Sequence, residues 1–188
     1  MAIITLTEIL NFAIISVALG FIFTGMYPSR PKTVYDQMHK RKFSIRDFKF
    51  ALAVVAPAVI LHELGHKFVA MGFGYSATFE LFPFGLVVGV ILKLVGSPLL
   101  LVAPGYVSIG TEAFTNAFAY RIIAFAGPAI NLILWLGSMF LLKTKIKLTT
   151  WQHSALKMSK LLNMLLFFFN MIPFGPFDGA KVFFGPPS

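Results

Sequence analysis

The amino-acid sequence predicts an all-α polytopic membrane protein with about four transmembrane helices and a small strand or re-entrant segment between the second and third spans. Three observations indicate this fold class. The 188 residues are 57% hydrophobic and only 12% charged, with a mean hydropathy of +0.82. Uncharged runs long enough to cross a bilayer recur along the chain. The basic residues gather between these runs, because seven of the 16 Lys and Arg lie within residues 30–49 and five within residues 143–160.

The composition also limits the partners and the kind of metal site. The chain contains no cysteine, which excludes disulfides and zinc–thiolate sites, so any zinc would have to be held by histidine and carboxylate groups. The formal net charge is +9, but the basic residues lie in short loops and do not alternate with aromatic residues as in nucleic-acid-binding modules. They fit anionic lipid headgroups and the positive-inside rule, which would place both loops in the cytosol. We therefore expect a lipid bilayer as a partner and no nucleic acid.

The first predicted span covers residues 9–29, which are uncharged and long enough to cross a bilayer. A signal peptide is the competing interpretation, but no basic segment precedes this run and Glu8 lies there instead. The chain length fits a single domain. In this domain residues 1–29 form an N-terminal transmembrane helix, residues 30–47 a basic loop and residues 48–182 the core.

The second span is predicted from Phe48 to Phe73. Ser44 fits the N-cap of this helix, and Asp47 would place an acid in its first turn. Pro57 falls inside the span, where it would either kink the helix or be tolerated, as in many membrane helices.

Residues 75–111 do not have the pattern of one continuous helix. Polar and apolar residues alternate over 76–82, which is typical of a strand, and glycines and prolines then interrupt a very apolar run. Irregular backbone at membrane depth must be covered by protein or water, so we expect a strand or hairpin followed by a re-entrant segment. A conventional extra helix across residues 86–103 is the alternative, and Lys93 argues mildly against it.

Two further spans are predicted, over residues 113–142 and 155–172. The first of them contains Gly127-Pro128 followed by Asn131, a pattern typical of close packing with a kink. We interpret Asn131 as a packing residue that could hydrogen-bond across helices, rather than as a catalytic residue.

The sequence His-Glu-Leu-Gly-His occupies residues 62–66, inside the second span. His62 and His66 are four residues apart, which places them on one face of a helix, about one turn from each other. Both imidazoles can then bind one Zn²⁺, and Glu63 lies where a general base for a water molecule belongs. The competing interpretation is two core histidines bonded to backbone carbonyls, with Glu63 paired to Lys67. Ionisable groups inside a membrane span are costly and tend to be functional, which favours the metal site.

The last span leads to a single carboxylate. Residues 161–177 are uncharged, and Asp178 follows them directly, with Gly179 next. An aspartate in this position needs a partner, and a metal ion is one good partner. Asp-Gly is also a common turn pair, so the spacing alone leaves a metal ligand and a turn equally open.

Three motifs together resemble the site-2 protease family of intramembrane zinc metalloproteases. They are His62-Glu-Leu-Gly-His66, Gly127-Pro128-Ala-Ile-Asn131, and Asn170 followed by Pro173 and Asp178-Gly179. The resemblance covers about residues 48–182, and the short chain is similar to the small prokaryotic, particularly archaeal, members. It implies a catalytic core of three transmembrane helices, preceded here by one N-terminal helix. Residues 105–110 resemble the apolar loop between the first two core helices of the family.

The resemblance also implies one zinc ion per chain and a set of site residues. The metal ligands would be His62, His66 and Asp178, and the catalytic residues would be Glu63 and Asn170. Glu63 would act first as a base and then as an acid, and Asn170 would lie near the substrate carbonyl. Many members continue further than Ser188 does here, so we expect either a minimal form of the family or a shortened chain.

We therefore expect an integral, multi-pass cell-membrane protease that hydrolyses peptide bonds in or next to transmembrane segments of membrane proteins. Because a transmembrane helix shields its own carbonyls, the substrate must unwind locally, and residues 76–82 could receive it as an added strand. The alternative from another class is a non-enzymatic membrane metal-binding protein or metal transporter that uses the same histidines and aspartate. A catalytically inactive scaffold is a third. Replacing Glu63 with Gln separates an enzyme, which loses cleavage but keeps zinc, from a transporter.

Overall fold

The computed structural model describes residues 3–25, 44–97 and 104–186. Within these residues the protein is mostly helical and contains one two-stranded sheet, which confirms the predicted helical content and the predicted small strand segment. The elements in chain order are α1 (Leu6–Ile22), α3 (Ile45–Gly72), β1 (Ala77–Leu81), α4 (Pro83–Leu94), β2 (Gly105–Ile109), the 3₁₀ helix η1 (Thr111–Thr115), α5 (Ala117–Lys143), α6 (Thr150–Asn170) and α7 (Asp178–Phe184).

Fewer helices qualify as transmembrane spans than the sequence analysis predicted. Among the described helices, only α3 and α5 are long and apolar enough to cross a membrane. Helix α1 has 17 residues, which is short for a full span. Helix α6 is 21 residues long, but its first half carries polar and basic residues, among them His153 and Lys157. The four predicted spans are therefore not confirmed as a set, although helices exist in all four regions.

Helix α1 begins and ends earlier than the predicted span over residues 9–29. Thr5 and Glu8 form a capping box, in which the Thr5 hydroxyl accepts from the Glu8 N–H and the Glu8 carboxylate accepts from the Thr5 N–H. Glu8, which was expected to lie outside the span, is thus inside the helix and buried. Residues 26–29, and the predicted basic loop up to residue 43, lie outside the described residues.

Helix α3 confirms the helix predicted from Phe48 to Phe73, and it is long and apolar enough to cross a membrane. It begins as expected, because the Ser44 side chain accepts a hydrogen bond from the Asp47 N–H at 3.4 Å. Pro57 is accommodated inside the helix, which continues to Gly72. The two histidines therefore lie in the interior of an unbroken helical segment.

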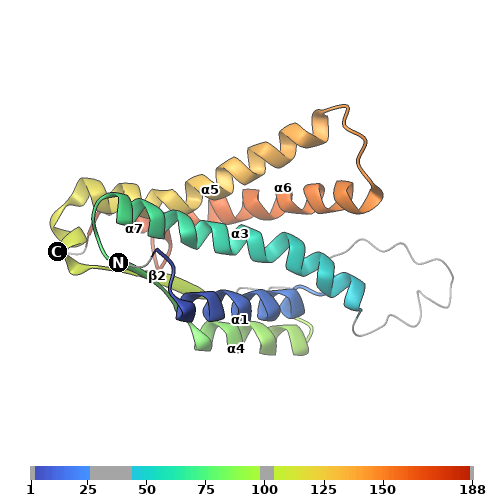
Figure 1. The fold of residues 1–188 in the computed structure, drawn as a ribbon, viewed down its shortest axis with the longest axis horizontal. Coiled ribbons are helices and arrows are strands. Elements are labelled where there is room, and N and C mark those ends of the chain that lie inside the picture. Colours follow the sequence, from blue (N-terminus) through green and yellow to red (C-terminus); the bar gives the residue numbers. More distant parts are fainter. Residues whose placement is uncertain (1–2, 26–43, 98–103, 187–188) are drawn as a thin grey trace.

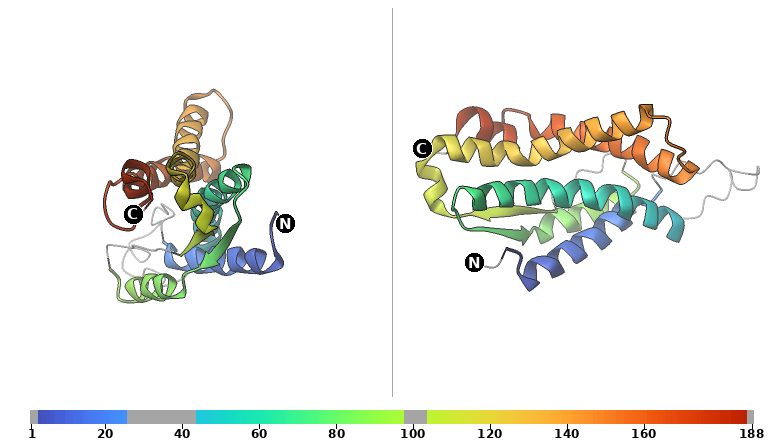
Figure 2. Two further views of the ribbon diagram at one scale, coloured as in Figure 1. Left: turned by 90° about the vertical axis from the view of Figure 1, so that its left-hand side faces the viewer. Right: turned by 45° about the horizontal axis from the view of Figure 1, so that its top comes forward.

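The long helices run along the long axis of the molecule, with α3 in the middle (Figure 1). Helix α3 packs against α5 and α6 on one side and against α1 on the other, and α5 packs in turn against α6 and α7. Figure 2 shows the same order, with the α5–α6 pair on one side of α3 and α1, α4 and the strands on the other. Side chains on one side of α3 therefore lie toward α5 and α6, and those on the other side lie toward α1.

The region between α3 and α5 contains both a strand pair and a helix. Strand β1 confirms the alternation read over residues 76–82, and it pairs antiparallel with β2, with Phe79 opposite Val107. Between the strands lies α4, which has 12 residues and begins with Pro83 at its first turn. It is too short for the alternative of a conventional span over residues 86–103, of which 98–103 lie outside the described residues. Residues 105–109, which the family resemblance placed in an apolar loop, form β2 instead.

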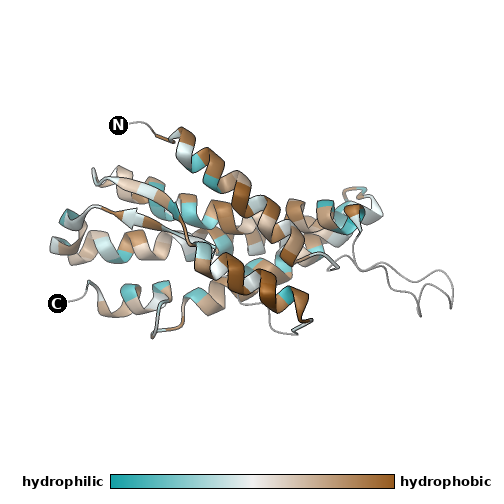
Figure 3. Ribbon diagram, turned by 90° about the horizontal axis from the view of Figure 1, so that it is seen from below, coloured by the Kyte–Doolittle hydropathy of each residue, from teal (hydrophilic) through white to brown (hydrophobic). Residues whose placement is uncertain are grey.

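Large apolar side chains cover much of the outer surface. On α1 and α4 they include Leu6, Leu10, Val17, Phe84, Val87, Ile91 and Leu94, each of which is more than half exposed. Figure 3, seen from the side of α1 and α4, shows mostly hydrophobic residues on these helices. A surface of this kind is unfavourable in water over such an area and matches the interior of a lipid bilayer.

Candidate active site

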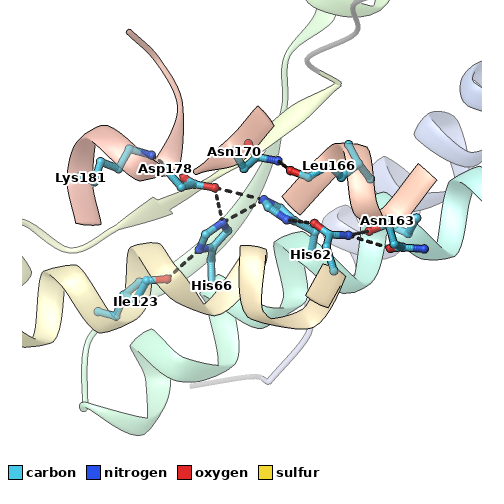
Figure 4. Close-up of polar contacts among 10 residues, drawn as sticks. His62, His66, Ile123, Asn163, Leu166, Asn170, Asp178 and Lys181 are labelled. Atoms are coloured by element: carbon cyan, nitrogen blue, oxygen red, sulfur yellow. Dashed lines mark hydrogen bonds and ion pairs between the residues drawn. The ribbon is translucent and has the colours of Figure 1, made fainter. Parts of the chain in front are cut away.

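The structure brings His62 and His66 of α3 together with Asp178, the first residue of α7. The two Nε2 atoms are 3.2 Å apart, and each lies 3.2 Å from Asp178 Oδ2 (Figure 4). Each of the three residues is only 7% exposed. His66 and Asp178, which are 112 positions apart in the chain, thus come together with His62. In the part of the chain that the structure describes, these three residues form a group that could hold a metal ion.

The spacing of these three atoms fits zinc. A tetrahedral Zn²⁺ with ligand bonds of about 2.0–2.1 Å separates its ligand atoms by roughly 3.3 Å, close to the 3.2 Å seen here. Two imidazoles and one carboxylate are a donor set found in catalytic zinc sites, where the fourth position is left for water or substrate.

Two glycines leave room for this arrangement where α3 and α5 approach each other. A Cβ on Gly65 would lie 2.9 Å from the carbonyl oxygen of Ala126 on α5. A Cβ on Gly127 would lie 2.7 Å from His62 Nε2 and still closer to His66 Nε2. The glycine of the Gly127-Pro128 pair therefore keeps open a space directly beside the two candidate ligand atoms.

The second nitrogen of each imidazole has a fixed partner. His62 Nδ1 lies 2.6 Å from Asn131 Oδ1, and His66 Nδ1 lies 2.7 Å from the carbonyl oxygen of Ile123. Both partners are acceptors, so each Nδ1 carries the proton and each Nε2 presents its lone pair. Hydrogen bonds of this kind orient metal-binding histidines and fix their tautomer.

A chain of side-chain amides extends this support into α6. The Asn131 amide donates to the carbonyl oxygen of Ala58 at 3.2 Å and to Asn163 Oδ1 at 2.9 Å. The Asn163 amide in turn donates to the carbonyl oxygen of Ser159 at 2.8 Å. Asn131 makes the interhelical bonds expected of a packing residue, and it also holds His62. The sequence analysis did not identify Asn163, although a lone asparagine within the apolar run 161–169 predicts a buried hydrogen-bonding partner.

The competing pairing of Glu63 with Lys67 is not what the structure contains. Lys67 forms a buried ion pair with Glu8 of α1, whereas Glu63 faces the cavity beside the histidines. Of the two histidines, only His66 bonds to a backbone carbonyl through Nδ1. Glu63 thus lines the cavity next to the two histidines and is not paired with Lys67.

Asp178 is both the start of a helix and a member of the cluster. Its Oδ1 accepts from Lys181 at 3.2 Å, while its Oδ2 faces the two histidines. The Lys181 ammonium thus lies against the carboxylate, which is the form of Asp178 that binds a metal ion.

A cavity of about 790 Å³ opens onto this cluster. Asn170 also lines it and donates through its amide to the carbonyl oxygen of Leu166 at 3.0 Å. Most of the remaining wall is apolar and comes from α1, α3, β2, α5 and α6, with Leu19, Phe23, Val59, Val107, Leu165 and Phe169 among its residues. An apolar cavity with a few converging polar groups is typical of an active site.

Comparison with known proteins finds relatives of one kind. The chain is 34% identical over 175 residues to a Methanocaldococcus jannaschii protein named as a putative zinc metalloprotease, covering 93% of this chain and 82% of that protein. It is 33% identical over 126 residues to a Synechocystis protein and 32% identical over 127 residues to the Rip3 protein of Mycobacterium tuberculosis, both named as putative zinc metalloproteases. These two matches cover 66% of this chain but only 28% of each longer relative. No protein-family model and no solved structure matches the chain.

Proposed function

The chain belongs to the site-2 protease family of zinc metalloproteases, and from this we propose that it is an intramembrane endopeptidase. It would hydrolyse peptide bonds in or next to transmembrane segments of membrane-protein substrates. The observation that carries the proposal is the convergence of His62, His66 and Asp178 beside Glu63 at the wall of an apolar cavity. The apolar outer surface and the two candidate spans α3 and α5 support a location in the membrane.

In this proposal one zinc ion is held by His62, His66 and Asp178. When bound, zinc supplies a Lewis acid that activates water and polarises the scissile carbonyl. Glu63 accepts a proton from the attacking water and later delivers it to the leaving amine. Asn170 donates its amide to the substrate carbonyl oxygen as negative charge develops there, after leaving the carbonyl of Leu166.

The strand pair suggests how a substrate segment could be held. Two backbone hydrogen bonds lie at the ends of the strand pair: the Gly110 N–H donates to the Ser76 carbonyl, and the Phe82 N–H donates to the Pro104 carbonyl. With the register of the pair, these bonds show that the backbone N–H and C=O groups of even-numbered residues point toward the partner strand. The backbone groups of Gly105, Val107 and Ile109 then face away from β1, and these residues line the cavity. We propose that an unwound substrate adds to this edge of β2 as a strand. This revises the expectation that residues 76–82 receive it.

The proposal is tested by zinc content and cleavage in detergent-purified protein. We expect about one zinc per chain in the parent and a sharp loss of zinc in Asp178→Ala. A folded parent that binds no zinc under metal-replete conditions would contradict the enzyme assignment. Zinc retained equally by both proteins would leave the histidine pair standing and assign the third ligand to another carboxylate.

The same preparation separates an enzyme from a metal transporter. Glu63→Gln should keep zinc, because residue 63 is not a proposed ligand, but it should lose cleavage of a membrane-protein substrate. A transporter would keep zinc flux in this variant. Flux into proteoliposomes by Glu63→Gln at the parental rate, without cleavage by the parent, would replace the protease with the transporter.

A further inference from the structure

A second buried polar cluster lies on the opposite side of α3 from the zinc ligands. Lys67, which directly follows His66, forms an ion pair with Glu8 of α1. Lys67 is 2% exposed and Glu8 is 1% exposed. An ion pair buried this deeply is a weak source of stability, because both charges are removed from water. Its presence therefore calls for a role beyond holding the helices together.

The Glu8 carboxylate also binds the sheet. Its Oε1 accepts the backbone N–H of Phe79 on β1 at 2.8 Å, in addition to Lys67. Its Oε2 accepts the Thr5 N–H and hydroxyl, so both carboxylate oxygens have hydrogen-bond donors. The Phe79 ring stacks on Phe12 of α1 with ring centroids 4.5 Å apart. Helix α1 thus contacts β1 through both the backbone N–H and the ring of Phe79.

This contact closes one edge of the two-stranded sheet. The backbone groups of even-numbered β1 residues point toward β2. The N–H of Phe79, an odd-numbered residue, therefore points away from β2 to the outer edge, where a further strand would otherwise pair. Glu8 takes the place of that strand's carbonyl. The opposite edge, at Val107 of β2, faces the cavity. In the proposed binding mode, this leaves the cavity-side edge of β2, near His62, His66 and Asp178, for the substrate.

We propose that Glu8 and Lys67 are positioning residues that set the placement of the substrate-binding strand relative to the zinc ligands. The inference rests on the proposed proteolytic function and on strand addition to β2. Lys67 is joined to His66 by the chain, and Glu8 joins Lys67 to Phe79, which pairs with Val107. The register between the metal and the bound substrate is thus fixed by one continuous set of contacts. Loosening it should change where and how well the substrate binds more than it changes the chemical step.

The test compares two double variants that differ in one group. Glu8→Met with Lys67→Met removes both charges without leaving either unpaired, which proteins tolerate far better than loss of one partner. Glu8→Gln with Lys67→Met also removes both charges but keeps an oxygen that can accept the Phe79 N–H. The control is Lys93→Met, which removes a contact between Lys93 of α4 and the Thr24 carbonyl after α1 and does not touch the sheet.

We expect the Met/Met variant to bind zinc like the parent but to raise KM about tenfold, as expected for one lost buried hydrogen bond, with a much smaller change in kcat. Its cleavage positions, read by mass spectrometry of the products, should spread over neighbouring peptide bonds. The Gln/Met variant should restore the single position and most of the KM, and Lys93→Met should cleave at the parental position. Unchanged KM and cleavage position in a folded, zinc-loaded Met/Met variant would overturn the inference.

Hydrogen exchange on the parent protein gives a test that needs no variant. The Phe79 amide should be protected in the free enzyme, while the Val107 amide should exchange readily and become protected when a substrate peptide binds. Fast exchange at Phe79 would overturn the inference. Failure of the parent to cleave at all would instead contradict the proposed function, so the two failures are distinct.

Discussion

His66 and Lys67 are neighbours in the chain, yet they belong to two buried polar clusters with opposite chemistry. On the side of α5 and α7, His62, His66 and Asp178 bring three acceptor atoms together around a point that needs a cation. On the side of α1, Lys67 supplies the cation itself, and Glu8 is surrounded by matched donors. The first cluster is incomplete without a ligand and the second is complete. The comparison indicates that burial of charge alone does not identify a site, whereas a converging set of acceptor atoms without a shared donor or cation does.

The sharpest way to test this contrast is to replace Glu63, the proposed general base, which lines the cavity beside the incomplete cluster. Glu63→Gln should lower cleavage by about 10²- to 10⁴-fold, because the attacking water loses its proton acceptor. Zinc content and thermal stability in detergent should stay at parental values. A product assay and metal analysis of the same preparation check both. Parental cleavage by this variant would assign the base to another residue.

A comparable effect on cleavage, with loss of zinc in addition, is expected from filling the space beside the histidines. Gly127→Ala places a methyl group against His62 and His66 Nε2, where the metal must sit, so zinc and cleavage should be lost together. Gly137→Ala is the matched control, because it lies on the same helix and a Cβ there meets nothing within 4 Å. Full zinc occupancy in Gly127→Ala would move the metal away from the three converging atoms.

The hydrogen-bond chain behind His62 should have a graded effect. Asn131→Ala removes the acceptor of His62 Nδ1 and should weaken zinc binding about 10- to 100-fold. Asn163→Ala removes only the partner of Asn131, so its effect on zinc affinity should be smaller. Competition with a zinc chelator measures both. An effect of Asn163→Ala larger than that of Asn131→Ala would contradict the order of this chain.

The complete cluster should respond in stability more than in metal binding. Lys67→Met leaves Glu8 charged and buried without its cation, which should cost about 3–5 kcal/mol in unfolding free energy. Adding Glu8→Met should recover most of this loss. Zinc occupancy of the folded fraction should stay close to the parental value. Thermal unfolding in detergent provides the measurement, and equal stability of the single and double variants would show that the two residues are not coupled.

Local patterns predicted helices α3 and α5 and the placement of two histidines on one face of α3, because each of these features depends on nearby residues. The spacing of His62 and His66, the N-cap at Ser44 and the alternation over 76–82 all refer to contacts within one element. The role of Asp178 stayed open from spacing, because it depends on how α7 packs against α5. The resemblance of the motifs to a known family, and not the local pattern, grouped Asp178 with His62 and His66, and the structure brings these three residues together.

Other features could not be predicted because distant residues decide them. Glu8 was expected to lie outside the first span, since nothing near it in the chain shows that Lys67 would neutralise it. Asn131 was interpreted as a packing residue, because its second partner, His62, lies 69 residues away. Strand β2 was expected as a loop, because its pairing with β1 is set across an intervening helix.

If a substrate adds to the cavity-side edge of β2 as proposed, the binding mode has a consequence for which substrates this protein can distinguish. A segment bound there is recognised through backbone groups, which are the same in every amino acid except proline. Side-chain identity then contributes little, and the discriminating property is how readily a helix gives up its own hydrogen bonds. Glycine and β-branched residues, which weaken helices, would mark a substrate more reliably than any consensus sequence. Such an enzyme would select by conformational instability, so related substrates need share no motif.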